Sequence, residues 1–204
     1  MAKVHASRKV RVALVAVVAA SGLLAAASHA AAASQYPVTY HVAPGVQANA
    51  GDPTGSPPGA NHWSCRPTQA HPRPVVLVHG LMATMQDNWN TMSPLLANHG
   101  YCVFALTYGT EGGDPYFGGL PPMEQTAHQL AAFVQRVLSA THVTKVDLIG
   151  HSEGTVMPRY YMEFLGGARY VGAIHVLANL AVVEVGHHGL VTRRLHRESP
   201  SWRR

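Results

Sequence analysis

The pentapeptide Gly150-His151-Ser152-Glu153-Gly154, with the residues on either side of it, constrains the fold of this chain most strongly. The run from Val143 to Ile149 before it ends in apolar residues, as a short buried strand does. Residues 155–165 after it carry apolar side chains at helical spacing, namely Val156, Tyr160, Tyr161, Phe164 and Leu165. A strand, a G-x-S-x-G sequence and a helix in this order are the context of a nucleophile elbow.

A nucleophile elbow is a strained turn that exposes a serine hydroxyl at the carboxyl edge of a sheet, near the positive end of a helix. The residues two before and two after the serine cannot carry bulky side chains in so tight a turn. Gly150 and Gly154 meet that demand and tolerate the strained backbone. Ser152 is therefore the candidate nucleophile. In the alternative interpretation Ser152 is only the N-cap of the following helix, a position that serine also favours.

The chain of 204 residues suits one domain, and 47% hydrophobic against 12% charged residues predicts a packed globule. Its formal net charge of +5 comes from its two ends. Nine of the 15 basic residues lie in the first eleven and the last twelve positions, and six remain against nine acidic residues between them. This mildly acidic balance argues against a nucleic-acid partner. No cofactor and no metal are expected, because the 14 histidines have no ligand spacing and two cysteines are too few for a thiolate zinc site.

Residues 1–33 are predicted to be a signal peptide, because basic residues precede an apolar stretch from Val12 to Ala27 and small residues follow it. The predicted localisation is therefore secreted. A transmembrane anchor is the alternative, although the apolar run is slightly short and is broken by Ser21-Gly22. Residues 34–73 are rich in glycine, proline, alanine and asparagine. They are expected to form an extended lead-in on the domain surface, with at most one short turn of structure.

Strands and helices are expected to alternate from residue 74 onward. Pro74 to Gly80 is an almost uninterrupted apolar run, typical of a parallel strand buried on both faces. Further strands are expected at residues 101–106, 143–149 and 170–177, and a glycine-rich loop at 108–119. Helices are expected at residues 88–99, capped by Asp87 and closed by Gly100, and at 126–140. The inward residues of these two helices are Trp89, Met92, Leu95, Leu96, Leu130, Phe133, Val134, Val137 and Leu138.

This alternation predicts a doubly wound, mostly parallel α/β sheet over residues 74–179. Ligands of such sheets bind at the carboxyl ends of the strands. His79-Gly80-Leu81 and the Ser152 turn both follow predicted strands, so the topology brings these two motifs together.

Several motifs occur here in the same order as in a known family. Through them the chain resembles the α/β-hydrolase family, specifically small secreted bacterial triacylglycerol lipases and esterases. The resemblance covers about Cys65 to Leu177. Its motifs are Val75-Val76-Leu77-Val78-His79-Gly80-Leu81, Asp87-Asn88-Trp89, Asn98-His99-Gly100-Tyr101-Cys102-Val103-Phe104, Val146-Asp147-Leu148-Ile149-Gly150-His151-Ser152-Glu153-Gly154 and Pro158-Arg159-Tyr160-Tyr161. It implies that Ser152 is the catalytic nucleophile and that the backbone N–H groups of Leu81 and Glu153 form the oxyanion hole. It also implies a lipid or small acyl-ester substrate and transient contact with lipid surfaces.

Two histidines near these motifs are poor candidates for the catalytic base. His79 stands before the loop glycine, where a structural role with its ring bonded to loop backbone fits better than a role as the base. His151 lies inside the elbow and is expected to point away from the approach of the Ser152 hydroxyl.

Cys65 and Cys102 form an even pair in a chain that is predicted to be exported, which indicates a disulfide. The bond would close a loop of about 37 residues and stabilise the fold by about 3–4 kcal/mol in the chain-entropy model. Two buried free thiols are the alternative.

The end of the chain departs from the family. In this fold the triad acid and then the histidine follow the serine on later loops. After Leu177 there is no aspartate, and the remaining candidates are Glu184, Glu198, His187, His188 and His196. A triad from Glu184 with His187 or His188 is possible in principle. Ala181-Val182-Val183-Glu184-Val185 could be a strand, but residues 180–204 as a whole are expected to be an atypical, disordered tail. Two hypotheses follow: a secreted serine ester hydrolase impaired by truncation, or a non-catalytic truncated relative.

Overall fold

The computed structural model describes residues 35–178, 181–186 and 189–191. The leader predicted over residues 1–33 and the arginine-rich stretch of residues 193–204 lie outside this range. No helix within the described residues is long and apolar enough to cross a membrane.

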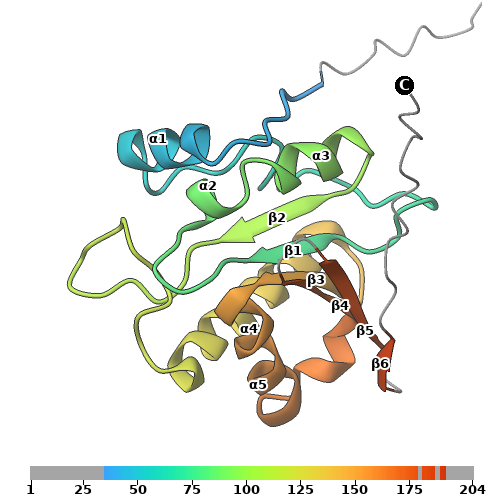
Figure 1. Cartoon of the computed structure of the whole chain (residues 1–204). Coiled ribbons are helices and arrows are strands. Elements are labelled where there is room, and N and C mark those ends of the chain that lie inside the picture. The colour runs from blue at the N-terminus through green and yellow to red at the C-terminus, as the bar shows by residue number, and fades with distance from the viewer. Residues whose placement is uncertain (1–34, 179–180, 187–188, 192–204) are drawn as a thin grey trace, which may run out of the picture. The chain divides into compact units, whose positions relative to one another are not determined.

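A six-stranded sheet in the order β2-β1-β3-β4-β5-β6 forms the centre of the described chain (Figure 1). Its strands are β1 (Val75–Val78), β2 (Val103–Leu106), β3 (Val146–His151), β4 (Val171–Ala178), β5 (Ala181–Gly186) and β6 (Gly189–Val191). The first four are parallel, and β5 and β6 are antiparallel additions at one side. The predicted mostly parallel α/β fold is therefore confirmed.

Helices cover both faces of the parallel strands (Figure 1). They are α1 (Ala43–Gly51), α2 (Met85–Asn88), α3 (Met92–Asn98), α4 (Met123–Thr141) and α5 (Met157–Phe164), with 3₁₀ turns η1 (Ser152–Thr155) and η2 (Gly167–Tyr170). Successive residues of a strand point to opposite faces. Val76 and Val78 of β1 accordingly join the core under α4 and α5, whereas Val75 and Leu77 join the core beside α3. All four β1 residues are buried, as predicted for a strand covered on both faces.

The single helix predicted over residues 88–99 is wrong, because two short helices occupy this stretch. Thr84, and not Asp87, is the N-cap of α2. Its side chain accepts from the Asp87 N–H, and the Asp87 carboxylate accepts from the Thr84 N–H at 2.9 Å, which is a capping box. Pro94 explains the break, since proline disrupts a helix interior but fits the first turn of α3. Gly100 does end the second helix, with φ of 85°.

The helix after the elbow buries only part of the predicted apolar set, because Tyr161 is buried and Tyr160 and Leu165 pack against the core, but the other two members are exposed. Met157, Pro158 and Tyr161 of this segment are buried, whereas Val156 and Phe164 are 49% and 63% exposed. The 3₁₀ turn η1 comes first and has a different number of residues per turn, so it shifts the phase of α5 relative to a helix starting at residue 155.

The lead-in contains the nine-residue helix α1, although only one short turn of structure was predicted for residues 34–73. This helix starts at Ala43-Pro44 and is built mainly from small and polar residues, so it has no apolar period to detect. Farther along, Asn61 lies against the outer edge of β2. Its side-chain amide donates to the Ala105 carbonyl at 2.9 Å and accepts from the Ala105 N–H at 3.0 Å.

Part of the segment expected to be a disordered tail, residues 180–204, forms strands. Strand β5 pairs with β4 in antiparallel register, with His175 opposite Glu184, and β6 pairs with β5. The residues Ala181-Val182-Val183-Glu184-Val185 favour this, because β-branched residues suit strands. The edge of β4 is therefore paired.

Cys65 and Cys102 are joined by a disulfide, as predicted, with Cα atoms 5.7 Å apart. Cys102 is buried directly before β2, and Cys65 lies in the lead-in. The bond thus ties the lead-in to the sheet.

We expect Cys65→Ser to lower the melting temperature by several degrees, because the disulfide contributes about 3–4 kcal/mol by restricting the unfolded chain. Thermal unfolding followed by circular dichroism measures this, and the oxidised chain should weigh two hydrogens less than the reduced one. Ser64→Ala, at the exposed neighbouring position, is the control and should leave the melting temperature unchanged. Free alkylation of both thiols in the folded protein would contradict this prediction.

Candidate active site

Ser152 occupies a strained turn at the carboxyl end of β3. Its φ of 52° lies in the left-handed region that non-glycine residues rarely adopt, and its side chain is exposed. A Cβ atom on Gly150 would overlap the carbonyl oxygen of Gly154. One on Gly154 would overlap the carbonyl oxygens of Val78 and His79. The turn therefore needs glycine at both positions for the steric reason that the sequence predicted.

The loop after β1 faces this turn. A Cβ atom on Gly80 would lie 3.1 Å from the Ser152 Cβ, so the two motifs separated in sequence are in contact. Asn88, the last residue of α2, contacts both motifs through its side chain. Its Oδ1 accepts from the Gly80 N–H at 3.0 Å and lies 3.1 Å from Nδ1 of His151. Sequence reasoning assigned Asn88 no role, and only its place in the motif Asp87-Asn88-Trp89 pointed to it.

The two predicted oxyanion donors lie on either side of this contact. The backbone N–H groups around Leu81 all have acceptors. Gly80 donates to Asn88 Oδ1, Met82 donates to the Gly118 carbonyl, and Ala83 donates to the Gly80 carbonyl. The Leu81 N–H has no such acceptor in the described part of the chain. Glu153 lies in the first turn of η1, where N–H groups lack acceptors within the helix.

His79 has the structural role that the sequence analysis favoured. The ring is fully buried, and Nδ1 lies 2.8 Å from the Gly80 carbonyl oxygen, to which it donates. Nε2 accepts from the Tyr108 N–H at 3.1 Å, and the Tyr108 ring stacks on the imidazole at 4.1 Å. Burial lowers the pKa of His79 to about 4. With both nitrogens engaged and the ring neutral, His79 is not available as the base for Ser152.

A base for Ser152 is missing from the described residues. No histidine among residues 35–178 forms a hydrogen bond with the Ser152 hydroxyl. The His151 ring contacts Asn88 instead, with Nδ1 3.1 Å from Asn88 Oδ1. His187, His188, His196 and Glu198 lie outside the described range, and the backbone places Glu184 in β5 opposite His175.

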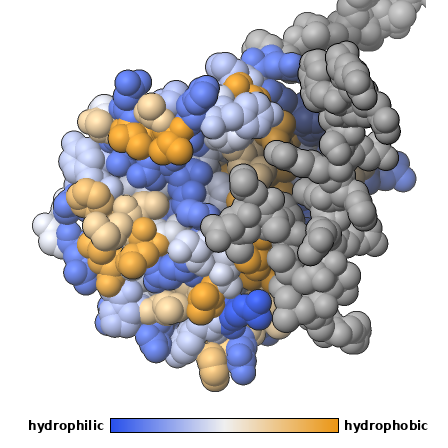
Figure 2. Space-filling model, in the orientation of Figure 1, coloured by the Kyte–Doolittle hydropathy of each residue, from blue (hydrophilic) through white to orange (hydrophobic). Residues whose placement is uncertain are grey.

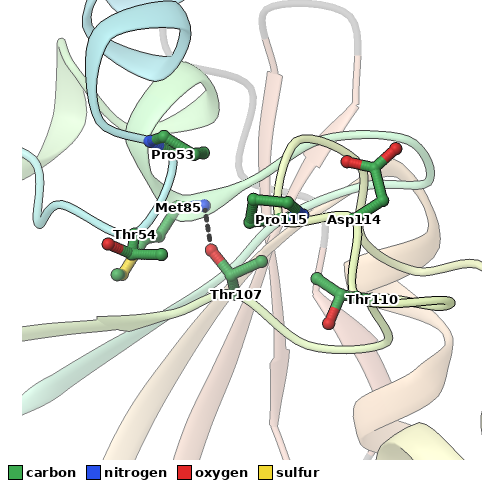
Figure 3. A pocket seen from close by; sticks show the side chains of 8 residues that line it. Pro53, Thr54, Met85, Thr107, Thr110, Asp114 and Pro115 are labelled. Carbon is green, nitrogen blue, oxygen red and sulfur yellow. Dashed lines mark hydrogen bonds between the residues drawn. The ribbon is translucent and has the colours of Figure 1, made fainter.

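Two hollows lie near the carboxyl ends of the strands. One, of about 320 Å³, is polar on several sides and lies between the lead-in and the glycine-rich loop; Figure 3 shows Thr54, Thr107 and Asp114 around it. None of its lining residues belongs to the elbow or to the His79-Gly80-Leu81 loop. The other, of about 400 Å³, reaches His151 and has Tyr40, Val42 and Val46 along one side.

Exposed hydrophobic side chains are frequent in the loops at this end of the sheet. They are Leu81, Met82, Tyr116, Phe117, Leu120, Met123 and Val156, besides Tyr40, Val42 and Val46 of the lead-in. Figure 2 shows hydrophobic surface over the side where Figure 1 draws these loops. Several of these apolar side chains therefore border the motifs that carry Ser152 and Leu81.

A parallel sheet, a tight serine turn after a central strand and a facing His-Gly loop together define the α/β-hydrolase class of proteins. A model of the family Lipase (class 2) matches residues 72–175, and the chain belongs to this family. The resemblance to bacterial triacylglycerol lipases that the motifs predicted is thereby confirmed.

Two curated relatives extend the comparison. A triacylglycerol lipase of Pseudarthrobacter phenanthrenivorans is 38% identical over 92 residues, which cover 43% of this chain and 27% of the relative. A triacylglycerol lipase of Burkholderia plantarii is also 38% identical over 92 residues, which cover 43% of this chain and 24% of the relative. The chain spans about a quarter of the length of these relatives.

Proposed function

We propose that this chain carries the nucleophile and the oxyanion hole of a secreted serine ester hydrolase that acts on acyl esters such as triacylglycerols. The observation that carries the proposal is the exposed Ser152 in a left-handed turn, packed against Gly80 of the facing loop. An N-cap serine does not require this strain or two flanking glycines without room for a Cβ. The names of the curated relatives supply the substrate class.

In the proposed reaction the Ser152 oxygen attacks the acyl carbonyl carbon. The carbonyl oxygen becomes an oxyanion that accepts from the N–H groups of Leu81 and Glu153, each contributing about 2.7–4 kcal/mol. The ester C–O bond then breaks, the alcohol leaves with the serine proton, and an acyl-serine remains. Water hydrolyses this ester and restores Ser152. A base must carry the proton in both steps, because a serine hydroxyl is otherwise a poor nucleophile.

The surroundings of Ser152 suit a lipid substrate. Leu81 of the facing loop is 56% exposed, and Val156, two residues after the elbow, is 49% exposed, so apolar side chains are accessible close in sequence to both motifs. These residues would lie against an acyl chain or a lipid surface during transient contact. Export agrees with the Cys65–Cys102 disulfide, since such bonds persist in oxidising compartments.

One observation favours a second candidate, a non-catalytic relative that keeps the binding surface. Within the described residues no histidine is bonded to Ser152, and both nitrogens of His79 are engaged. The two candidates differ in whether a base reaches the serine.

We expect a fluorophosphonate to label Ser152, whose oxygen displaces fluoride from phosphorus while its proton passes to solvent. Labelling is slow without a base, so it is followed over hours by intact mass and peptide mapping. Ser152→Ala should abolish it, and Ser139→Ala, an exposed serine on α4, should leave it unchanged. Label that persists in the Ser152→Ala variant would remove the elbow assignment.

A further inference from the structure

The side chain of Glu153 lies beside the second donor residue of the proposed oxyanion hole. Its Oε2 atom is buried and has no hydrogen-bond partner in the described part of the chain. A Cβ atom on Gly119 would lie 2.8 Å from this oxygen and 3.2 Å from the Leu81 Cα. Gly119 therefore lies close to both the Glu153 carboxyl group and the Leu81 backbone.

The turn at Gly118-Gly119 is bonded to the loop that carries Leu81. The Met82 N–H donates to the Gly118 carbonyl at 2.8 Å, and the Gly118 N–H donates to the Ala83 carbonyl at 3.0 Å. Gly119 has a φ of 74° and donates its N–H to the Tyr108 carbonyl at 2.8 Å. A displacement of this turn would consequently move the residue that follows Leu81.

We propose that Glu153 is a positioning residue whose side chain supports the Gly118-Gly119 turn only while its carboxyl group is uncharged, so that ionisation weakens the oxyanion hole. This rests on the proposed function, since Leu81 and Glu153 are its donors. A buried oxygen without a donor is tolerated in a neutral carboxyl group, whereas a carboxylate needs several donors or water. An ionised Glu153 would therefore leave the turn, and its charge would oppose a developing oxyanion nearby.

The electrostatic surroundings of Glu153 also favour its uncharged form. Burial raises the pKa of Glu153 above its ordinary value of 4.5. The carboxyl group therefore stays neutral at a pH where exposed glutamates are ionised, and becomes charged as the pH rises through the raised pKa. The ionisable residues of the loops around it are Tyr108, His79, His151, Glu111, Asp114 and Tyr116. The elements that contact η1 add Asp147 of β3, His175 of β4, and Arg159, Tyr160 and Glu163 of α5. Within the described residues none of the cations among them forms a salt bridge with Glu153. Burial, and then the charge of Glu153, raise the pKa of Tyr108.

A titration of the whole chain by NMR from about pH 4 to about pH 10 tests this directly. We expect the Glu153 carboxyl carbon to titrate above the ordinary glutamate pKa of 4.5, and Glu163, an exposed glutamate on α5, is followed as the control. The amide signals of Leu81 and Gly119 should shift with the same midpoint as Glu153. Glu153→Gln, which imitates the neutral acid, should remove this shift, and Glu163→Gln should keep it.

Labelling of Ser152 by the fluorophosphonate gives the second readout. The rate for the wild-type chain, divided by the rate for Glu153→Gln, should fall roughly tenfold or more across the Glu153 midpoint, because a nearby charge opposes the transition state. The same ratio taken with Glu163→Gln should stay constant. Common titration of Glu153 and Glu163, or a Leu81 amide that ignores the Glu153 midpoint, would overturn the proposal. Absence of any Ser152 labelling counts against the proposed function instead, and the amide titration still decides the role of Glu153.

Discussion

Replacing Gly150 or Gly154 by alanine is expected to destabilise the chain by about 4 kcal/mol or more, enough to prevent stable folding. In both cases the added Cβ atom would overlap backbone carbonyl oxygens, of Gly154 in the first variant and of Val78 and His79 in the second. Backbone atoms cannot rotate away as a side chain does. Val78 also belongs to β1, so relief of the overlap would disturb a central strand.

Thermal unfolding by circular dichroism measures this effect. Gly51→Ala is the matched control, because a Cβ atom there has no atom within 4 Å and the residue ends an exposed helix. Its melting temperature should stay that of the wild-type chain. A Gly150→Ala variant with the wild-type melting temperature would show that the turn is looser than described.

The chain of 204 residues is expected to hydrolyse esters far more slowly than a working esterase. This prediction takes residues 180–204 as a tail that supplies no base, and no histidine among residues 35–178 is bonded to Ser152, so that the oxyanion hole and substrate binding act alone. In serine hydrolases that lack a triad member this contribution is about 10³–10⁴ over water. Turnover of a short-chain p-nitrophenyl ester should accordingly remain below about 1 s⁻¹, the lower end of ordinary enzymes.

The assay compares the purified chain with its Ser152→Ala variant, so that only turnover dependent on Ser152 is counted. A Ser152-dependent rate above about 1 s⁻¹ would show that a base reaches the hydroxyl from residues outside the described range. It would also remove the non-catalytic candidate.

The sequence predicts best those features that depend on neighbouring residues. The continuous apolar run Val75–Val78 predicted a strand buried on both faces, and it is one. Gly150 and Gly154 flank Ser152 because of a local steric demand, and this too is visible in five residues. The disulfide followed from the count and context of two cysteines.

Features that depend on distant partners could not be predicted in this way. Asn88 bonds Gly80 and His151, and nothing near Asn88 in the sequence indicates the second partner. The phase of α5 is set by the 3₁₀ turn before it, so a helical pattern starting at Thr155 correctly included Tyr161 but also included Val156 and Phe164, which are exposed. Pro94 was a local signal against one long helix, which the apolar spacing around it concealed.

The lead-in limits how short an expressed fragment of this protein can be made. Asn61 and the bridge between Ala60 and Val103 occupy the outer side of β2, which would otherwise be an open sheet edge. Open edges recruit strands from other molecules. The stretch that matches the family begins at residue 72, so expressing it alone would expose this edge and discard Cys65. The smallest fragment that keeps this edge of β2 covered is therefore longer than the region matched by the family, and it begins before Ala60.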